Sequence, residues 1–231
     1  MTGGERAWAP RTAVLAVRAV ADGEPTRWYE ELWGEAARGQ LDLPWSRTAP
    51  FPAVAELVAA TGPGEGRRAV VVGAGLGADA EHLAVHGWAT TAFDVAPSAV
   101  DLVTSRYPDS AVDYRVADLL DLPDDLVGVF DLVVEVFTLQ ALPATVRHRA
   151  TTAVRSLLAP GGTLLVAQLV RERGAPSPAE PPWPLDEDEV RALATDEVHL
   201  DRLERRPLPG SPGGADLWVA VLHRDPPAGA G

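Results

Sequence analysis

The sequence contains no cysteine, and it also lacks lysine, asparagine and isoleucine. Without cysteine the chain can form no disulfide bond, and it has neither a thiolate metal ligand nor a cysteine nucleophile. The five histidines occur in no metal-ligand spacing such as HExxH. We therefore predict that the protein holds no metal.

Basic side chains are scarce as well: 20 Lys and Arg stand against 33 Asp and Glu, so the formal net charge is -13 and the pI about 4.7. Binding of polyanions relies on basic groups that displace counterions, which disfavours nucleic acid and anionic membranes as partners. Long apolar runs are also missing, because Arg18 interrupts the apolar stretch 13–17. No stretch is long enough to cross a bilayer, and we predict a cytoplasmic protein.

With 231 residues and 46% hydrophobic residues, the chain can bury a full core. Strand-like and helix-like segments alternate from residue 67 onward. We predict an N-terminal helical cap over residues 1–66, one α/β domain over residues 67–224, and a disordered tail over residues 225–231.

Three glycines at alternate positions mark the most informative stretch, VVVGAGLGADAE, which runs from Val70 to Glu81. The β-branched residues at its start indicate a strand buried on both faces of a parallel sheet. Gly73, Gly75 and Gly77 lack Cβ, so the backbone there can adopt positive φ and approach a ligand closely. Open α/β sheets bind ligands at this edge.

The spacing alone leaves the ligand open, because Gly73, Gly75 and Ala78 also satisfy the dinucleotide fingerprint. Asp79 and Glu81 occupy the first turn of the following helix, where carboxylates would repel a pyrophosphate. They would suit a ligand that carries an ammonium and a sulfonium group. Asp79 is also expected to be the N-cap of that helix.

Acidic residues follow the next three predicted strands at the same edge of the sheet. Asp94 ends the strand 89–93, about 20 residues beyond the glycines, where a carboxylate can accept hydrogen bonds from a ribose diol. Asp118 follows the short strand 112–116, and Glu135 with Phe137 lies at the exit of the strand FDLVVEVF. A last pair of strands, 198–206 and 216–223, is predicted to be antiparallel.

Together with LLAPGGTLLV before the fifth strand, these features resemble class I S-adenosylmethionine-dependent methyltransferases over residues 67–224. The resemblance implies a Rossmann-like, doubly wound, seven-stranded sheet that is mostly parallel with an antiparallel C-terminal strand. It implies S-adenosyl-L-methionine as the cofactor and methyl transfer to O, N or S of a small-molecule acceptor. No catalytic residue is assigned, since the leaving thioether needs no protonation.

The resemblance also assigns cofactor-binding roles, residue by residue. Gly73, Gly75 and Gly77 would contact the methionine part, Asp94 with its neighbour Val95 the ribose, and Asp118 the adenine amino group, with Leu119 beside the ring. For Glu135 two readings stay open, a contact with the methionine ammonium or a surface ion pair.

The N-terminal segment is similar to the thiopurine methyltransferase-like branch, in which two aromatics four residues apart pack over the cofactor. Tyr29 and Trp33 have that spacing, on a predicted amphipathic helix. Trp45 and Phe137 are assigned to the acceptor pocket. We predict that Tyr29, Trp33 and Trp45 form a lid, although the stripe would also suit simple packing against the core. A nicotinamide-dependent oxidoreductase and a non-catalytic ligand-binding protein remain alternatives.

Overall fold

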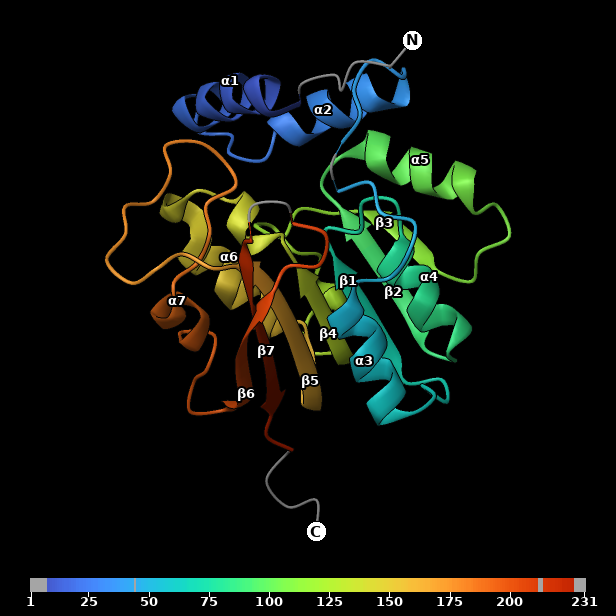
Figure 1. Cartoon of the computed structure of the whole chain (residues 1–231). Helices are drawn as coiled ribbons and strands as arrows, with labels where there is room; N and C mark the ends of the chain where they lie inside the picture. The colour runs from blue at the N-terminus through green and yellow to red at the C-terminus, as the bar shows by residue number, and fades with distance from the viewer. Residues whose placement is uncertain (1–7, 44, 212–213, 227–231) are drawn as a thin grey trace.

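A seven-stranded sheet with strand order β3-β2-β1-β4-β5-β7-β6 forms the centre of the computed structural model, which describes residues 8–43, 45–211 and 214–226 (Figure 1). Strands β1 to β5 run parallel, and β7 runs antiparallel to both β5 and β6. The predicted mostly parallel sheet with an antiparallel C-terminal strand is thus confirmed. The strands are β1 (Arg68–Val72), β2 (Ala89–Asp94), β3 (Asp113–Val116), β4 (Phe130–Val136), β5 (Leu158–Leu169), β6 (Val198–Pro207) and β7 (Asp216–Arg224).

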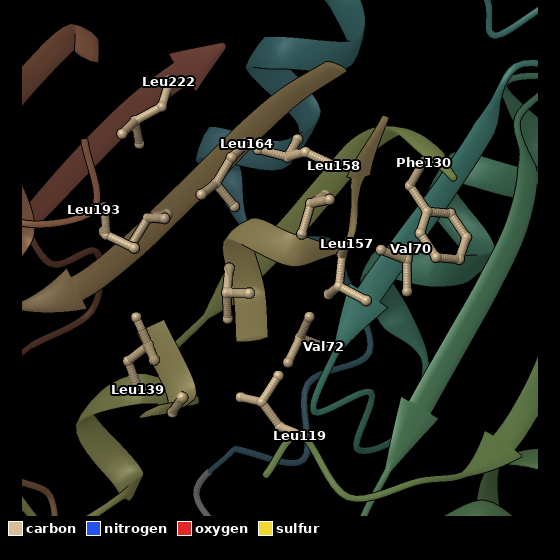
Figure 2. Close-up of a cluster of buried hydrophobic side chains, with 14 of the residues drawn as sticks. Val70, Val72, Leu119, Phe130, Leu139, Leu157, Leu158, Leu164, Leu193 and Leu222 are labelled. Carbon is tan, nitrogen blue, oxygen red and sulfur yellow. The ribbon is translucent and has the colours of Figure 1, made fainter. Parts of the chain in front are cut away.

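The first strand explains why both faces of the sheet are covered. Val70 and Val72 point into one hydrophobic cluster, while Ala69 and Val71 point into another, as the twofold periodicity of a strand requires. The first cluster is packed by α6 (Ala144–Ser156) and α7 (Glu187–Arg191), and Figure 2 shows Val70 and Val72 beside its leucines. The second cluster is packed by α3 (Pro52–Thr61) and α4 (Ala78–Val85).

Helix α3 lies in the segment that we expected to cap the site, but it packs on the sheet instead. Val54 and Val58 are buried against Val71 and Leu83 of β1 and α4. Its sequence explains both ends, because Pro52 takes the first helical position and Gly62 stops the helix with a φ of 74°.

The remaining N-terminal helices, α1 (Trp8–Ala21) and α2 (Trp28–Ala37), lie across the top of the molecule in Figure 1. They share a third hydrophobic cluster with Ala96 and Ala99, at the start of α5 (Pro97–Arg106). Glu30 of α2 stabilises this contact, because its carboxylate accepts hydrogen bonds from the backbone N–H and the Oγ of Ser98, at 2.9 and 2.6 Å. The structure therefore has a cap made of α1 and α2.

Helix α1 was not predicted from the sequence. Its buried residues are Thr12, Ala13, Leu15, Ala16 and Ala19, while Val14 and Val17 are exposed. Apolar residues on both sides of the helix obscure the helical period that would have revealed it.

The sequence also predicts a fifth strand over residues 163–170 and a helix over residues 185–194, and the structure differs from both predictions. Strand β5 begins at Leu158 rather than Thr163, because Leu158 already pairs with Phe130 before a register shift. The predicted helix 185–194 is α-helical only over Glu187–Arg191, where a capping box between Asp186 and Glu189 starts it. Of the predicted tail 225–231, residues 227–231 lie outside the described residues.

None of the helices in the described ranges has the length and apolar character needed to cross a membrane. Within those same ranges, no cluster of three or more metal-ligating side chains occurs.

Candidate functional site

A cavity of about 460 Å³ opens at the carboxyl edge of the sheet, beneath the cap. Its size is within the range of small-molecule sites. Ten of the twelve predicted site residues line it: Gly73, Gly75, Asp94, Val95, Asp118, Leu119, Tyr29, Trp33, Trp45 and Phe137. Gly77 and Glu135 do not line it.

The glycine turn lies where β1 ends, and two of its glycines face the cavity. Gly73 has a φ of 67°, and a Cβ there would come within 2.4 Å of Thr138 Oγ1. Gly75 has a φ of 50°, and a Cβ there would lie 3.5 Å from the ring of Trp33. Both positions therefore need glycine for the backbone conformation, and Gly73 needs it also because a Cβ would clash with Thr138.

Gly77 has a different role from the one predicted. It is the N-cap of α4 with a φ of 78°, and a Cβ on it would come within 2.3 Å of Tyr114 Oη and 2.6 Å of Val103 Cγ2. This glycine lets α4 pack closely on β3 and α5. The structure thus corrects the expectation that it faces a ligand.

Asp94 joins the second strand to the glycine turn. Its Oδ2 accepts a hydrogen bond from the Gly75 N–H, and its Oδ1 accepts one from the Ala96 N–H, each at 3.1 Å. Burial raises the pKa of this carboxyl, and the backbone N–H groups around it partly oppose that effect. A carboxylate has about four lone-pair sites, so Asp94 can still accept hydrogen bonds from a ligand in the cavity.

Asp118 occupies the corresponding place after β3. Its Oδ1 accepts a hydrogen bond from the Leu120 N–H at 2.8 Å, and within the described ranges Oδ2 has no partner. Leu119 beside it is buried and offers an apolar surface to the cavity. The ends of β1, β2 and β3 therefore place the glycine turn and two carboxylates, Asp94 and Asp118, beside the same cavity.

Glu135 is completely buried, and neither predicted role agrees with its contacts. Its Oε1 accepts hydrogen bonds from the N–H groups of Thr138 and Leu139, at 2.7 and 2.9 Å, and its Oε2 accepts one from Gln168 Nε2 at 2.5 Å. Burial raises its pKa to about 7. It is neither in the cavity nor in a surface ion pair; it holds the chain segment that follows β4.

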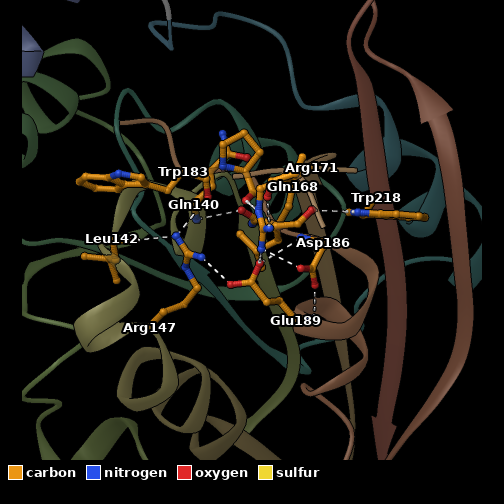
Figure 3. Close-up of polar contacts among 12 residues, drawn as sticks. Gln140, Leu142, Arg147, Gln168, Arg171, Trp183, Asp186, Glu189 and Trp218 are labelled. Carbon is orange, nitrogen blue, oxygen red and sulfur yellow. Dashed lines mark hydrogen bonds and ion pairs between the residues drawn. The ribbon is translucent and has the colours of Figure 1, made fainter. Parts of the chain in front are cut away.

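That segment, the 137–141 turn, connects three parts of the site. Thr138 Oγ1 donates to the Val72 carbonyl at 3.0 Å, and the Ala141 carbonyl accepts a hydrogen bond from Tyr29 Oη at 2.7 Å. The Gln140 carbonyl accepts one from the Trp183 N–H at 2.7 Å; Figure 3 shows Gln140 and Trp183 in this region. The end of β1 before the glycine turn, the cap and the proline-rich loop of residues 171–184 are thus all hydrogen-bonded to this one segment.

The acidic first turn of α4 does not have the role proposed from the sequence. Asp79 is not the N-cap: it accepts hydrogen bonds from the Phe51 N–H and from Arg47 Nη2, both at 2.6 Å. Glu81 accepts hydrogen bonds from Ser110 and Tyr114 hydroxyls, and it does not line the cavity. Asp79 lines the cavity, but its carboxylate is paired with Arg47 and the Phe51 N–H, and the carboxylate of Glu81 is held by two hydroxyls.

Several lining residues were missed. Arg47, Trp8 and Leu208 line the cavity; for Arg47 the predicted pocket residue Trp45, two positions earlier, was the available signal. From the sequence alone, the proline-rich loop RERGAPSPAEPPWP, residues 171–184, could be either a plain connection or a segment that overhangs the site. Pro181 and Pro182 line the cavity, and Trp183 is buried in the cluster formed by α1 and α2, so the loop overhangs the site.

Residues 69–162 match the methyltransferase-domain family. An O-methyltransferase of ubiquinone biosynthesis from Xanthomonas campestris is 37% identical over 115 residues, which make up 48% of this chain and 46% of that protein. The chain thus spans about half the length of the curated relatives it matches.

Two solved structures share the fold. The N-methyltransferase NodS of Bradyrhizobium japonicum, in complex with S-adenosyl-L-homocysteine, is 20% identical with a TM-score of 0.60, over 93% of this chain and 98% of that chain. The cyclase SpnF is 16% identical with a TM-score of 0.65, over 88% of this chain and 96% of that chain. At such identities the likeness establishes the fold and leaves the reaction open.

Proposed function

We propose that this chain, which carries a class I methyltransferase domain with its family match over residues 69–162, transfers the methyl group of S-adenosyl-L-methionine to a small-molecule acceptor. One observation carries the proposal. The Gly75 N–H donates to the Asp94 carboxylate, so the glycine turn and the acidic end of the second strand face one cavity.

The donor set of the cavity fits this cofactor. Asp94 would accept hydrogen bonds from the ribose diol, and Asp118 would accept one from the adenine amino group. Leu119 and Phe93 would cover the adenine ring, since both line the cavity. Gly73 and Gly75 line the cavity and would contact the methionine part. Gly77 and Glu135 are not included in this set.

When bound, the cofactor supplies a methyl group activated by a positively charged sulfur. The protein then has to align the acceptor with that carbon and keep water away, and no proton has to reach the leaving group. Two side chains of α2 would exclude water from the cavity. They are Trp33, whose ring is next to Gly75, and Tyr29, whose hydroxyl donates a hydrogen bond to the Ala141 carbonyl. We still assign no general base.

Two other functions use the same fold. One is a nicotinamide-dependent oxidoreductase, which would need a pyrophosphate at the start of α4. The other is a non-catalytic ligand-binding protein on the same fold. The similarity to the thiopurine methyltransferase-like branch, the O, N or S nature of the acceptor atom and a cytoplasmic location stay predictions from the sequence, as does the absence of a nucleic-acid or membrane partner.

A thermal-shift comparison tests the proposed function. S-adenosylhomocysteine at 100 times its dissociation constant should stabilise the fold by about 2.7 kcal/mol. NAD and NADP should leave the unfolding temperature unchanged. A shift with NADP and none with S-adenosylhomocysteine would favour the oxidoreductase. A shift with S-adenosylhomocysteine but no methylated product with any acceptor would favour a non-catalytic protein or another reaction.

A further inference from the structure

We infer that the acceptor is a flat aromatic compound whose ionised oxygen or sulfur faces Arg47. This inference rests on the proposed methyl transfer and names the acceptor class of the same site. It follows from how the polar and apolar parts of the cavity are distributed along the sheet, and from the groups that are missing where the acceptor would react.

The cavity spans two chemically different halves of the sheet edge. The exits of β1, β2 and β3 contribute Gly73, Asp94 and Asp118, which form the half assigned to the cofactor. On the other side of β1, the exits of β4 and β5 contribute Phe137 and Leu169. Apolar side chains from separate segments, namely Trp8, Trp45, Pro181 and Leu208, also line the cavity, and we assign them to the acceptor half.

The walls of the acceptor half are aromatic and fixed in orientation. Trp8 and Trp45 contact each other edge to face, with ring centroids 5.6 Å apart and planes at 75°. Phe137 contacts Phe51 in the same way, at 5.3 Å and 78°. Phe137 follows the end of β4, and its φ of 65° is unusual for a bulky residue. Such walls favour a flat ring through aromatic contacts.

Arg47 is the only cationic side chain that lines the cavity within the described ranges. Asp79 holds its guanidinium through Nη2 at 2.6 Å, and Phe51 lies 5.4 Å from its central carbon. The side chain is 32% exposed. Nη1 donates to Ala49 and weakly to Asp79, while Nε has no acceptor among the described residues. A fixed guanidinium with a remaining donor is suited to bind an anion.

The titratable groups of the cavity provide no base for the acceptor. Asp79 is held by Arg47 and the Phe51 N–H, and Asp94 and Asp118 belong to the cofactor half. Tyr29 donates its hydroxyl hydrogen to Ala141, and burial together with the charge of Asp94 raises its pKa well above the usual value. An acceptor that needs a base from the protein would therefore react poorly.

An acceptor already ionised removes that need. Its proton goes to solvent on binding, and Arg47 stabilises the anion. The oxygen or sulfur then donates an electron pair to the methyl carbon, and the cofactor sulfur keeps the pair of the bond that breaks. One negative and one positive charge disappear together, and an apolar cavity favours this neutralisation. The products are a methyl ether or thioether and a neutral thioether.

A spectroscopic titration of 4-nitrophenol, whose anion absorbs visible light, tests the inference in the presence of S-adenosylhomocysteine. Binding beside Arg47 should raise the ionised-to-neutral ratio of the probe at a given pH by about tenfold, because an opposite charge lowers the pKa of an acid. Arg47→Leu should abolish this change, and Arg47→Lys should keep part of it.

Arg115→Leu is the matched control. Arg115 also pairs with carboxylates and is 37% exposed, but it lies outside the cavity. Its loss should leave the probe spectrum unchanged. Cyclohexanol should compete at least tenfold more weakly than 4-nitrophenol. Equal competition, an unchanged ionised fraction of the bound probe, or no binding of the probe while S-adenosylhomocysteine still binds would overturn the inference. Failure of S-adenosylhomocysteine itself to bind would instead contradict the proposed function.

Discussion

The Asp94 carboxylate has two tasks, since it fixes the Gly75 and Ala96 N–H groups and also faces the cavity. Replacing it by alanine would leave both N–H groups without a partner, so Asp94→Asn is the cleaner change. Because hydrogen bonds to a charged group contribute about 1.5 to 3 kcal/mol each, we expect the affinity for S-adenosylhomocysteine to fall about tenfold to a hundredfold by calorimetry.

Asp131 offers the control for this change. Its carboxylate also accepts a backbone hydrogen bond, from the Arg68 N–H at 2.8 Å, but it lies beside the start of β1, at the opposite edge of the sheet. Asp131→Asn should leave the affinity unchanged. Equal affinity in the Asp94→Asn variant and the wild type would mean that Asp94 only shapes the turn.

Glu135 makes the stability of the protein depend on pH, and comparison with a Glu135→Gln variant separates this contribution from those of other groups. Its folded-state pKa of about 7 is raised from 4.5 by burial. Both states bind the proton below pH 4.5. Between pH 4.5 and pH 7 the unfolded state releases the proton while the buried Glu135 of the native state keeps it, so the free energy of unfolding falls as the pH rises. Wild type should therefore lose on the order of 3 kcal/mol relative to Glu135→Gln between these pH values, with no further loss above them.

Urea unfolding of the two proteins from pH 4.5 to pH 8 measures this difference. The absolute stability of the variant is not diagnostic, because the introduced amide would rearrange the hydrogen bonds of Thr138 and Gln168. The slope is diagnostic. Parallel stability curves across this range would show that burial does not perturb Glu135.

At the scale of elements, α2 is attached to the sheet through the 137–141 turn and to α5 through Glu30. Tyr29→Phe removes the 2.7 Å hydrogen bond to the Ala141 carbonyl and keeps the ring. We expect about 1 kcal/mol of lost stability, and faster amide hydrogen exchange confined to α2 and the turn, because local opening needs one fewer bond to break.

The affinity for S-adenosylhomocysteine should change little in Tyr29→Phe, since the ring still covers the cavity. Glu30→Gln serves as the comparison, because it weakens the hydrogen bonds to Ser98 that join α2 to α5. Exchange rates in α2 that stay at the wild-type value in Tyr29→Phe would show that the turn does not restrain the cap.

At the scale of the whole molecule, the cap is packed rather than loosely attached. Trp33 is 3% exposed and belongs to the cluster shared by α1, α2 and α5. We therefore expect Trp33→Ala to cost about 3 to 5 kcal/mol of stability, as large-to-small core changes do. Trp45 is only half-buried, and Trp45→Ala should cost clearly less.

The lid proposed for Tyr29, Trp33 and Trp45 stays a prediction, and hydrogen exchange tests it. S-adenosylhomocysteine should slow amide exchange across residues 26–48, because ligand binding opposes opening of the cap. If this segment is fully protected from exchange before the ligand is added, and does not change afterwards, the three aromatics do not move as a lid.

The sequence predicted the sheet, and ten of the twelve predicted site residues line the cavity, because these features depend on local patterns. Three apolar valines before spaced glycines, and carboxylates after successive strands, indicate the same edge without any knowledge of packing. The errors arose where long-range contacts decide. Asp79 is bonded to Arg47 and Phe51, about 30 residues earlier, and Glu135 to Gln168 on the neighbouring strand, so no local pattern reveals either partner.

The division of the cavity has a further consequence for how such an enzyme diversifies. Most of the acceptor walls, including Trp8, Trp45, Pro181 and Leu208, lie outside the segment 69–162 that carries the family match. Under the proposed function, mutation or recombination in these flanking segments would change the preferred acceptor, while Gly73, Gly75, Asp94 and Asp118, which are assigned to the methyl donor, are inherited intact. Tyr29 and Trp33 are the exceptions, because they lie in the flanks. A chimaera that joins these flanking segments to the central domain of a relative should inherit the acceptor preference of the flanks.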